Sequence, residues 1–217
     1  MQFRRIILGL LSLLFLSLCF TISGCKLIVM KLIGAKKPDV ETFETIKSQY
    51  KAIDIREENF YIMKEDSLLM QFFRFANEVR LFDKNGIMIR EDSLAGMKGC
   101  SGNIVTFISS VPPVTYAYRD SSQSLSRCLH SIKHIEKDIY PTFDTTQYDY
   151  LAIVYWNSFS GREHNLPQLK RIMAAIEKNK YSRIHFIPVN CDMYEGVDWD
   201  KKYEDYKAKI RASKAQN

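Results

Sequence analysis

The chain has 217 residues, of which 46% are hydrophobic and 26% charged, with a formal net charge of +6 at pH 7. This composition excludes a disordered or low-complexity protein, because the apolar side chains suffice for a core. The basic residues are interspersed with acids and form no stripe, so no nucleic-acid partner is indicated. Beyond an N-terminal segment, the length suits one substantial domain.

The first 24 residues have the parts of a bacterial export signal. A basic start precedes an apolar stretch over residues 6–20, and Ile22-Ser23-Gly24-Cys25 follows. That tetrapeptide resembles the lipobox of bacterial lipoproteins. The resemblance implies that residues 1–24 are removed and that Cys25 is acylated, which leaves residues 25–38 as a membrane tether. An uncleaved anchor helix is the alternative, because apolar residues continue past the cysteine.

The lipobox also implies a location. Lys26 follows the lipid cysteine, where enteric bacteria place an aspartate in lipoproteins kept in the inner membrane. We therefore expect a lipid-anchored protein of the bacterial cell envelope, in the outer membrane if the organism has two membranes. The expected partners are the membrane, through the anchor, and another protein of the envelope.

The first part of the globular region predicts short elements without chemistry. Helical spacing of apolar residues covers 40–50, and the compositions of 51–55 and 60–63 are typical of strands. Asp66 is a candidate N-cap for the helix that follows.

Residues 79–90 predict a β-hairpin. Two β-rich runs flank Asn85-Gly86, and both of these residues tolerate the positive φ that a tight turn needs. After this hairpin the apolar spacing favours a helix over 104–111, with a strand as the alternative because the segment is rich in β-branched residues.

A long helix is predicted from Asp120 to Ile139. Asp120 with Gln123 three residues later resembles a capping box, and apolar residues then recur at helical spacing. His130 and His134 would lie one turn apart on its exposed side, where two imidazoles could chelate a metal. No third ligand follows at a recognisable spacing, so no metal site and no cofactor are predicted.

The C-terminal part predicts a βαβ unit followed by a surface helix over 199–217. An apolar strand over 148–156, an amphipathic helix over 162–179 and a strand over 183–190 imply two parallel strands joined by a crossover helix. Pro188 lacks a backbone donor, which predicts that its strand lies at an edge of the sheet.

Residues 156–163, Trp-Asn-Ser-Phe-Ser-Gly-Arg-Glu, resemble the Trp-x-x-Trp-Cys-x-x-Cys segment of the thioredoxin-like thiol–disulfide oxidoreductases. The Asn85-Gly86 hairpin is similar to the one that ends that family's sheet. The resemblance implies a thioredoxin-like α/β three-layer sandwich over 39–217, with a central mixed sheet flanked by helices. Here the hairpin half precedes the βαβ half, so the order is permuted and the hairpin should lie beside the first βαβ strand. A separate small sheet for the hairpin is the alternative.

The two reactive cysteines of that family are absent, because Ser160 and Glu163 stand in their places. A serine hydroxyl cannot form a disulfide, so the resemblance implies no thiol–disulfide chemistry and no enzyme. A binding or scaffolding module is expected instead. Its surface would be the loop at the helix N-terminus, through Asn157, Ser160, Arg162 and Glu163.

Three cysteines remain after the signal and lipid positions, namely Cys100, Cys128 and Cys191. One disulfide with a leftover thiol and three buried free thiols are both compatible with the spacing. A thiol oxidoreductase that uses these cysteines is the alternative function. It needs two of the sulfurs within disulfide range and one of them exposed.

Overall fold

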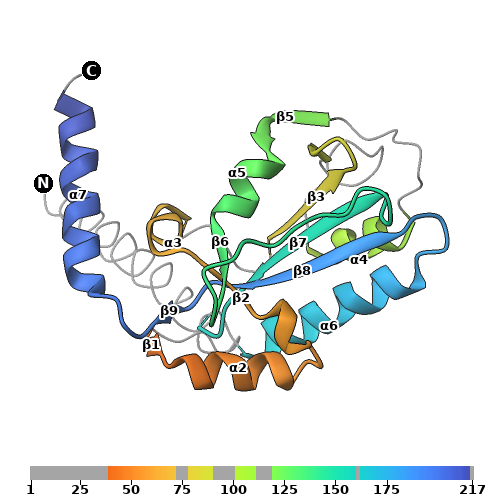
Figure 1. Ribbon diagram of the computed structural model, residues 1–217, viewed down its shortest axis with the longest axis horizontal. Helices are drawn as coiled ribbons and strands as arrows, with labels where there is room; N and C mark the ends of the chain where they lie inside the picture. Colours follow the sequence, from red (N-terminus) through yellow and green to blue (C-terminus); the bar gives the residue numbers. More distant parts are fainter. Residues whose placement is uncertain (1–38, 72–77, 90–100, 111–118, 160–161, 216–217) are drawn as a thin grey trace, which may run out of the picture.

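The computed structural model describes residues 39–71, 78–89, 101–110, 119–159 and 162–215. A seven-stranded sheet runs through the centre in the order β5-β4-β3-β7-β8-β2-β6 (Figure 1). Its strands are β2 (Tyr61–Met63), β3 (Val79–Asp83), β4 (Ile87–Ile89), β5 (Arg119–Ser124), β6 (Ile132–His134), β7 (Tyr150–Trp156) and β8 (Ile184–Asn190).

A second, two-stranded sheet pairs β1 (Val40–Glu41) in parallel with β9 (Met193–Tyr194). The helices of the described chain are α2 (Phe43–Lys51), the 3₁₀ turn η1 (Glu57–Asn59), α3 (Glu65–Gln71), α4 (Ser101–Ser110), α5 (Leu125–His130), α6 (Arg162–Lys178) and α7 (Trp199–Ala215). The protein is therefore an α/β sandwich with a mixed sheet, as the sequence predicts at this coarser level.

The predicted βαβ unit is confirmed. Strands β7 and β8 pair in parallel along their whole length, from Tyr150 beside Ile184 to Trp156 beside Asn190, and α6 connects them. All seven residues of β7 are buried, because helices or loops cover both faces of this central strand.

The predicted hairpin is also confirmed, and it belongs to the main sheet. β3 pairs antiparallel with β4 and, on its other side, antiparallel with β7, with Val79 opposite Val154 and Phe82 opposite Leu151. The separate small sheet is thereby excluded. At the turn, Gly86 has φ +74°, and the Asp83 carboxylate accepts the N–H of Asn85 at 2.9 Å.

Helices lie on both faces of the sheet. α6 contacts β7, β8 and α4, so α4 and α6 form one layer (Figure 1). On the opposite face Arg80 of β3 lies over the ring of Tyr155 and donates to the Cys128 sulfur of α5 at 3.3 Å. The predicted helix over 104–111 corresponds to α4, which begins earlier, at Ser101. The alternative prediction of a strand in this segment is therefore wrong.

The predicted long helix over 120–139 is wrong. Arg119–Ser124 is strand β5, the Ser124 hydroxyl caps the short α5 by accepting the N–H of Arg127, and Ile132–His134 is strand β6. β6 pairs antiparallel with β2, with His134 opposite Tyr61. The two histidines therefore do not share a helix face, and His134 is buried.

Pro188 does not lie at a sheet edge. β8 lies between β7 and β2, so that prediction is wrong. The Pro188 carbonyl accepts from the Tyr50 hydroxyl at 3.2 Å, while pairing with β2 begins only at Val189, opposite Tyr61. The proline is tolerated because the β2 ladder has not yet begun at its position.

Two smaller predictions near the start of the domain need correction. Residues 51–55 form no strand, because α2 continues to Lys51 and the chain then turns through Asp54 at φ 63°. α3 begins at Glu65, so Asp66 is already inside the helix rather than its N-cap.

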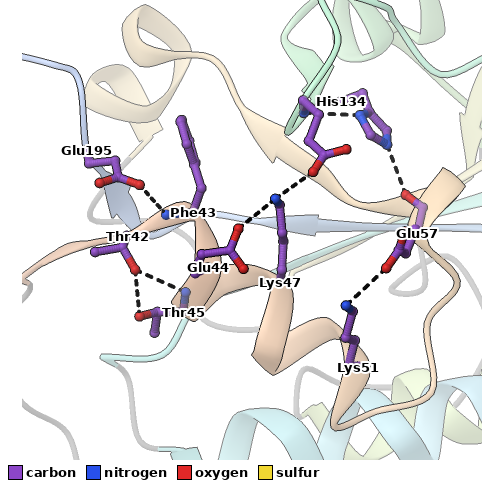
Figure 2. A network of polar contacts seen from close by, with 10 residues as sticks. Thr42, Phe43, Glu44, Thr45, Lys47, Lys51, Glu57, His134 and Glu195 are labelled. Carbon is purple, nitrogen blue, oxygen red and sulfur yellow. Dashed lines mark hydrogen bonds and ion pairs between the residues drawn. The ribbon is translucent and has the colours of Figure 1, made fainter.

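Polar contacts hold α2 to its surroundings at its first residue and near its middle (Figure 2). The Phe43 N–H donates to Glu195 at 2.8 Å, and Lys47 lies between Glu44 at 2.8 Å and Glu136 at 2.5 Å.

Within the described part of the chain, no helix has both the length and the apolar character needed to cross a bilayer.

Candidate functional site

The carboxyl ends of the parallel strands β7, β8 and β2 meet at one edge of the sheet. Ligand sites in sheets of this kind form outside these strand ends, so this edge is the first place to look for a functional site. Asn157 and Ser158 follow β7 here, and Asp192 follows β8.

Asp192 is the centre of a hydrogen-bonded cluster at this edge. Its carboxylate is 1% exposed and accepts from the Ser158 N–H at 2.8 Å, from the Ser158 Oγ at 3.0 Å and from Asn190 Nδ2 at 2.8 Å. The Asp192 N–H donates in turn to Asn190 Oδ1 at 3.0 Å. Burial raises the pKa of the Asp192 carboxyl, since the charged form is poorly solvated there.

A second carboxylate reaches the same serine from a distant part of the chain. Ser158 Oγ lies 3.1 Å from Glu41 Oε1, and Glu41 belongs to β1. The cluster therefore joins three segments: the N-terminal strand, the loop after β7 and the end of β8. The Cys191 N–H also donates to the Trp156 carbonyl at 2.7 Å and extends the β7–β8 ladder into this region.

The structure describes three of the four predicted binding residues, and they lie in two different elements. Asn157 is 1% exposed, so the loop begins inside the protein. Ser160 lies outside the described residues. Arg162 and Glu163 are the first two residues of α6. The binding role of these four residues remains a prediction.

Sequence reasoning missed Asp192 and Glu41. A polar turn after a buried strand, Asn190-Cys191-Asp192, was a usable signal for the first. No local sequence signal points to Glu41, because its contact with Ser158 spans 117 positions of sequence.

Cys128 and Cys191 are both free and buried. Burial raises the pKa of the Cys191 thiol well above its ordinary value, which disfavours the thiolate. Cys128 receives the Arg80 hydrogen bond, but the same guanidinium is paired with Glu78 at 2.7 Å. Cys100 lies outside the described residues. Neither described thiol has the exposure expected of a reactive cysteine.

In the described part of the chain, no group of three His, Cys, Asp or Glu side chains is placed to hold a metal ion. The ring of His134 uses both nitrogens within the protein. Nε2 donates to the Glu57 carbonyl at 2.9 Å, and Nδ1 accepts the Glu136 N–H at 3.1 Å. His130 contacts the Ser126 carbonyl through Nδ1 at 2.7 Å.

Two neighbouring hollows of about 380 and 450 Å³ lie along α7 and share Lys202 and Asp205. Glu65 lines the first, and its carboxylate accepts from Lys133 at 2.8 Å and from the Tyr194 hydroxyl at 2.6 Å. Burial of Glu65 opposes its ionisation, but these hydrogen bonds outweigh burial and lower its pKa to about 2. Lys202, which lines both hollows, pairs with Asp66 at 2.8 Å, and the mixture of acids and bases selects no ligand class.

In comparisons with known proteins, no protein-family model, no curated protein and no solved structure matches the chain.

Proposed function

We propose that the protein is an exported, membrane-tethered lipoprotein whose thioredoxin-like domain serves as a binding or scaffolding module of the cell envelope, without thiol–disulfide chemistry. The observation that carries this proposal is the strand order β8-β7-β3-β4, in which β7 and β8 are parallel and β3 and β4 are antiparallel. These are the neighbours and directions that the resemblance implies for a permuted thioredoxin-like sheet. This sheet is larger, because β2 and β6 lie beyond β8 and β5 lies beyond β4.

The cysteines support a role without redox chemistry. Ser160 and Glu163 occupy the positions of the reactive pair, and neither can take part in thiol–disulfide exchange. Cys128 and Cys191 are buried, so they do not offer a replacement pair at the surface.

The loop before α6 is the proposed binding surface. Asn157 and Ser158 are buried, and Ser158 is bonded to Asp192, so the start of the loop is fixed to the core. A loop whose first residues are already fixed to the core loses less conformational entropy when it binds a partner. Arg162 and Glu163 begin the 17-residue helix α6, and Ser160 precedes them in the sequence. The first N–H groups of a helix have no partner within the helix itself, so a helix N-terminus favours an anionic or acceptor group.

The anchor is tested by labelling with radioactive palmitate in the native host. We expect the wild-type protein to be labelled and to have lost residues 1–24, and the Cys25→Ser variant to be unlabelled. An unprocessed, unlabelled wild-type protein in the membrane would show that the N-terminal segment is an uncleaved helix instead.

The binding surface is tested by cross-linking and affinity purification from membranes. We expect the wild-type protein to retain a stoichiometric envelope partner and the Arg162→Glu/Glu163→Arg double variant to lose it. The matched control is Lys170→Glu/Glu177→Lys, which reverses the same two charges at exposed positions further along α6. Equal recovery with both double variants would argue against the loop, and no partner with the wild type would favour a purely structural lipoprotein.

Thiol labelling separates the proposal from the oxidoreductase alternative. We expect Cys128 and Cys191 to react with maleimide only after unfolding, with or without prior reductant. A pair of cysteines that becomes labelled in the folded protein only after reduction would support a thiol oxidoreductase.

A further inference from the structure

The second half of α7 carries charge of one sign. After Asp205 the sequence contains no aspartate or glutamate. The same stretch contains four basic residues, Lys207, Lys209, Arg211 and Lys214. Basic side chains complement the dipole of a helix only near its last turn, and α7 continues to Ala215. The dipole therefore does not account for Lys207 and Lys209.

Two of these basic side chains have no acidic partner. In the part of the chain that the structure describes, the ion pairs of α7 are Lys202 with Asp66 and Lys207 with Glu204. Lys209 and Arg211 are exposed and form no ion pair there. Their charges are thus available to an anionic partner.

The basic residues of this half-helix flank a line of apolar surface. Tyr203 and Ile210 are seven residues apart, so they lie on the same side of α7. Tyr203 is 45% exposed, and Lys207 Nζ lies 4.5 Å from the centre of its ring. By the helical repeat, Lys207 and Arg211 lie on one side of this line and Lys209 on the other. Aromatic and aliphatic side chains between flexible basic ones are typical of helices that lie at a bilayer surface.

α7 begins where the N-terminal segment enters the domain. β1 pairs with β9, and the Trp199 indole N–H at the base of α7 donates to the Tyr194 carbonyl of β9 at 2.8 Å. From there α7 stands away from the main sheet, with α3 as its main neighbour among the described elements (Figure 1).

The anchor limits the distance between α7 and the bilayer. Val40 of β1 is 15 positions after Cys25, and a chain of this length spans at most about 50 Å. A helix of 17 residues is about 25 Å long. With Cys25 held in the membrane, the second half of α7 can therefore reach the surface of the same bilayer.

We propose that residues 203–215 of α7 dock onto the anionic headgroups of the membrane that holds the anchor. The inference rests on the proposed function, because the anchor is what brings α7 to lipid. Lys207, Lys209 and Arg211 bind lipid phosphate groups, while Tyr203 and Ile210 enter the headgroup layer. Each Lys or Arg at an anionic surface strengthens binding roughly fivefold, so three give about a hundredfold. This second contact would hold the loop before α6 at a fixed distance from the bilayer.

Paramagnetic relaxation from a nitroxide on the lipid headgroup measures the contact. The full-length protein, with its isoleucine methyl groups labelled with ¹³C, is reconstituted into nanodiscs of phosphatidylcholine with or without phosphatidylglycerol. We expect the Ile210 methyl signal to be broadened only where phosphatidylglycerol is present. The broadening should be lost at about 1 M salt, where the screening length falls to about 3 Å. Ile172, which is fully buried in α6, is the reference in the same spectrum.

Charge reversal tests the basic residues. We expect Lys209→Glu/Arg211→Glu to lower the relaxation enhancement of Ile210 at least about fivefold. The matched control is Lys170→Glu/Arg171→Glu, which makes the same charge change at exposed positions of α6 and should leave the enhancement unchanged. Equal broadening of wild-type Ile210 on both lipids, or none on either, would overturn the docking without recourse to a variant.

Co-elution with the nanodiscs tests the anchor separately. An anchored protein co-elutes with both lipid compositions, whatever α7 does. Co-elution with both but no broadening of Ile210 removes the docking and leaves the anchor. Co-elution only with the phosphatidylglycerol nanodiscs removes the anchor and supports the docking, and co-elution with neither overturns both.

Discussion

Replacing Tyr50 by phenylalanine tests the polar junction at which the hydroxyl of this α2 residue contacts the backbones of both β2 and β8. The Tyr50 hydroxyl is fully buried and accepts the Asn190 N–H at 2.9 Å. It donates toward the carbonyls of Tyr61 and Pro188. Phenylalanine keeps the ring but removes every one of these contacts.

The expected cost follows from the groups that lose their partner. The Asn190 N–H and at least one of the two carbonyls would be left without the hydroxyl in a dry environment, and each such group costs about 1–3 kcal/mol. The ring itself still stacks on Phe60 at 4.8 Å and meets the edge of Trp156 at 5.2 Å, so little apolar packing is lost. We therefore expect Tyr50→Phe to lower the free energy of unfolding by about 2–6 kcal/mol.

Urea titration followed by circular dichroism, with both proteins in the same detergent, measures this difference. A loss of this size corresponds to a fall in melting temperature of roughly 4–24 °C for a domain of this length. The matched control is Tyr181→Phe, the same chemical change at a side chain that is 63% exposed, which should lie within about 0.5 kcal/mol of the wild type. A Tyr50→Phe variant as stable as Tyr181→Phe would refute the reasoning that this hydroxyl satisfies the β2–β8 junction.

Three further predictions concern the hairpin and two ionisable groups. Gly86→Ala should cost about 1–2 kcal/mol in urea titration, because φ is +74° and the new Cβ would lie 3.2 Å from Leu125 Cβ; a neutral effect would contradict the turn geometry. Burial lowers the pKa of His185, so the unfolded chain takes up the proton first as the pH falls below about 6.5; stability should decrease there, and His185→Gln should reduce this dependence. The pKa of Glu65 is about 2, below the unfolded value of about 4.3, so its contribution is present above that value and is lost on acidification toward pH 2; Glu65→Gln should flatten this part of an acid titration, and an unchanged profile would argue against the ion pair with Lys133.

Local sequence patterns predicted the elements that have strong local causes. The Asn85-Gly86 turn permits positive φ, and it is the hairpin turn between β3 and β4. The apolar run of β7 and the amphipathic spacing of α6 likewise predicted a buried strand and a helix that covers it. These signals are local because backbone conformation and side-chain periodicity over a few residues are enough to produce them.

The predicted helix over 120–139 shows where local reasoning fails. Leu125, Cys128 and Ile132 have helical spacing, yet the helix ends at His130 and Ile132 enters β6. Pairing with β2 decides this conformation, because an exposed strand edge gains hydrogen bonds that no nearby residue can offer. Such pairing depends on residues about seventy positions away.

Local patterns likewise indicated only part of the candidate site. The loop after β7 and the turn at Asn190-Cys191-Asp192 could be recognised as strand ends. Their junction with Glu41 could not, because it depends on β1 pairing with β9 across the whole length of the domain.

The sequence by itself determined the α/β class, the βαβ unit, the hairpin and the absence of the paired cysteines, since each follows from neighbouring residues. Only the tertiary structure decided that β8 is an interior strand, that His134 and Cys191 are buried, and that Glu41 and Asp192 meet on one serine hydroxyl. These features arise from contacts between segments far apart in the chain, and the free energy of such contacts has no counterpart in local spacing.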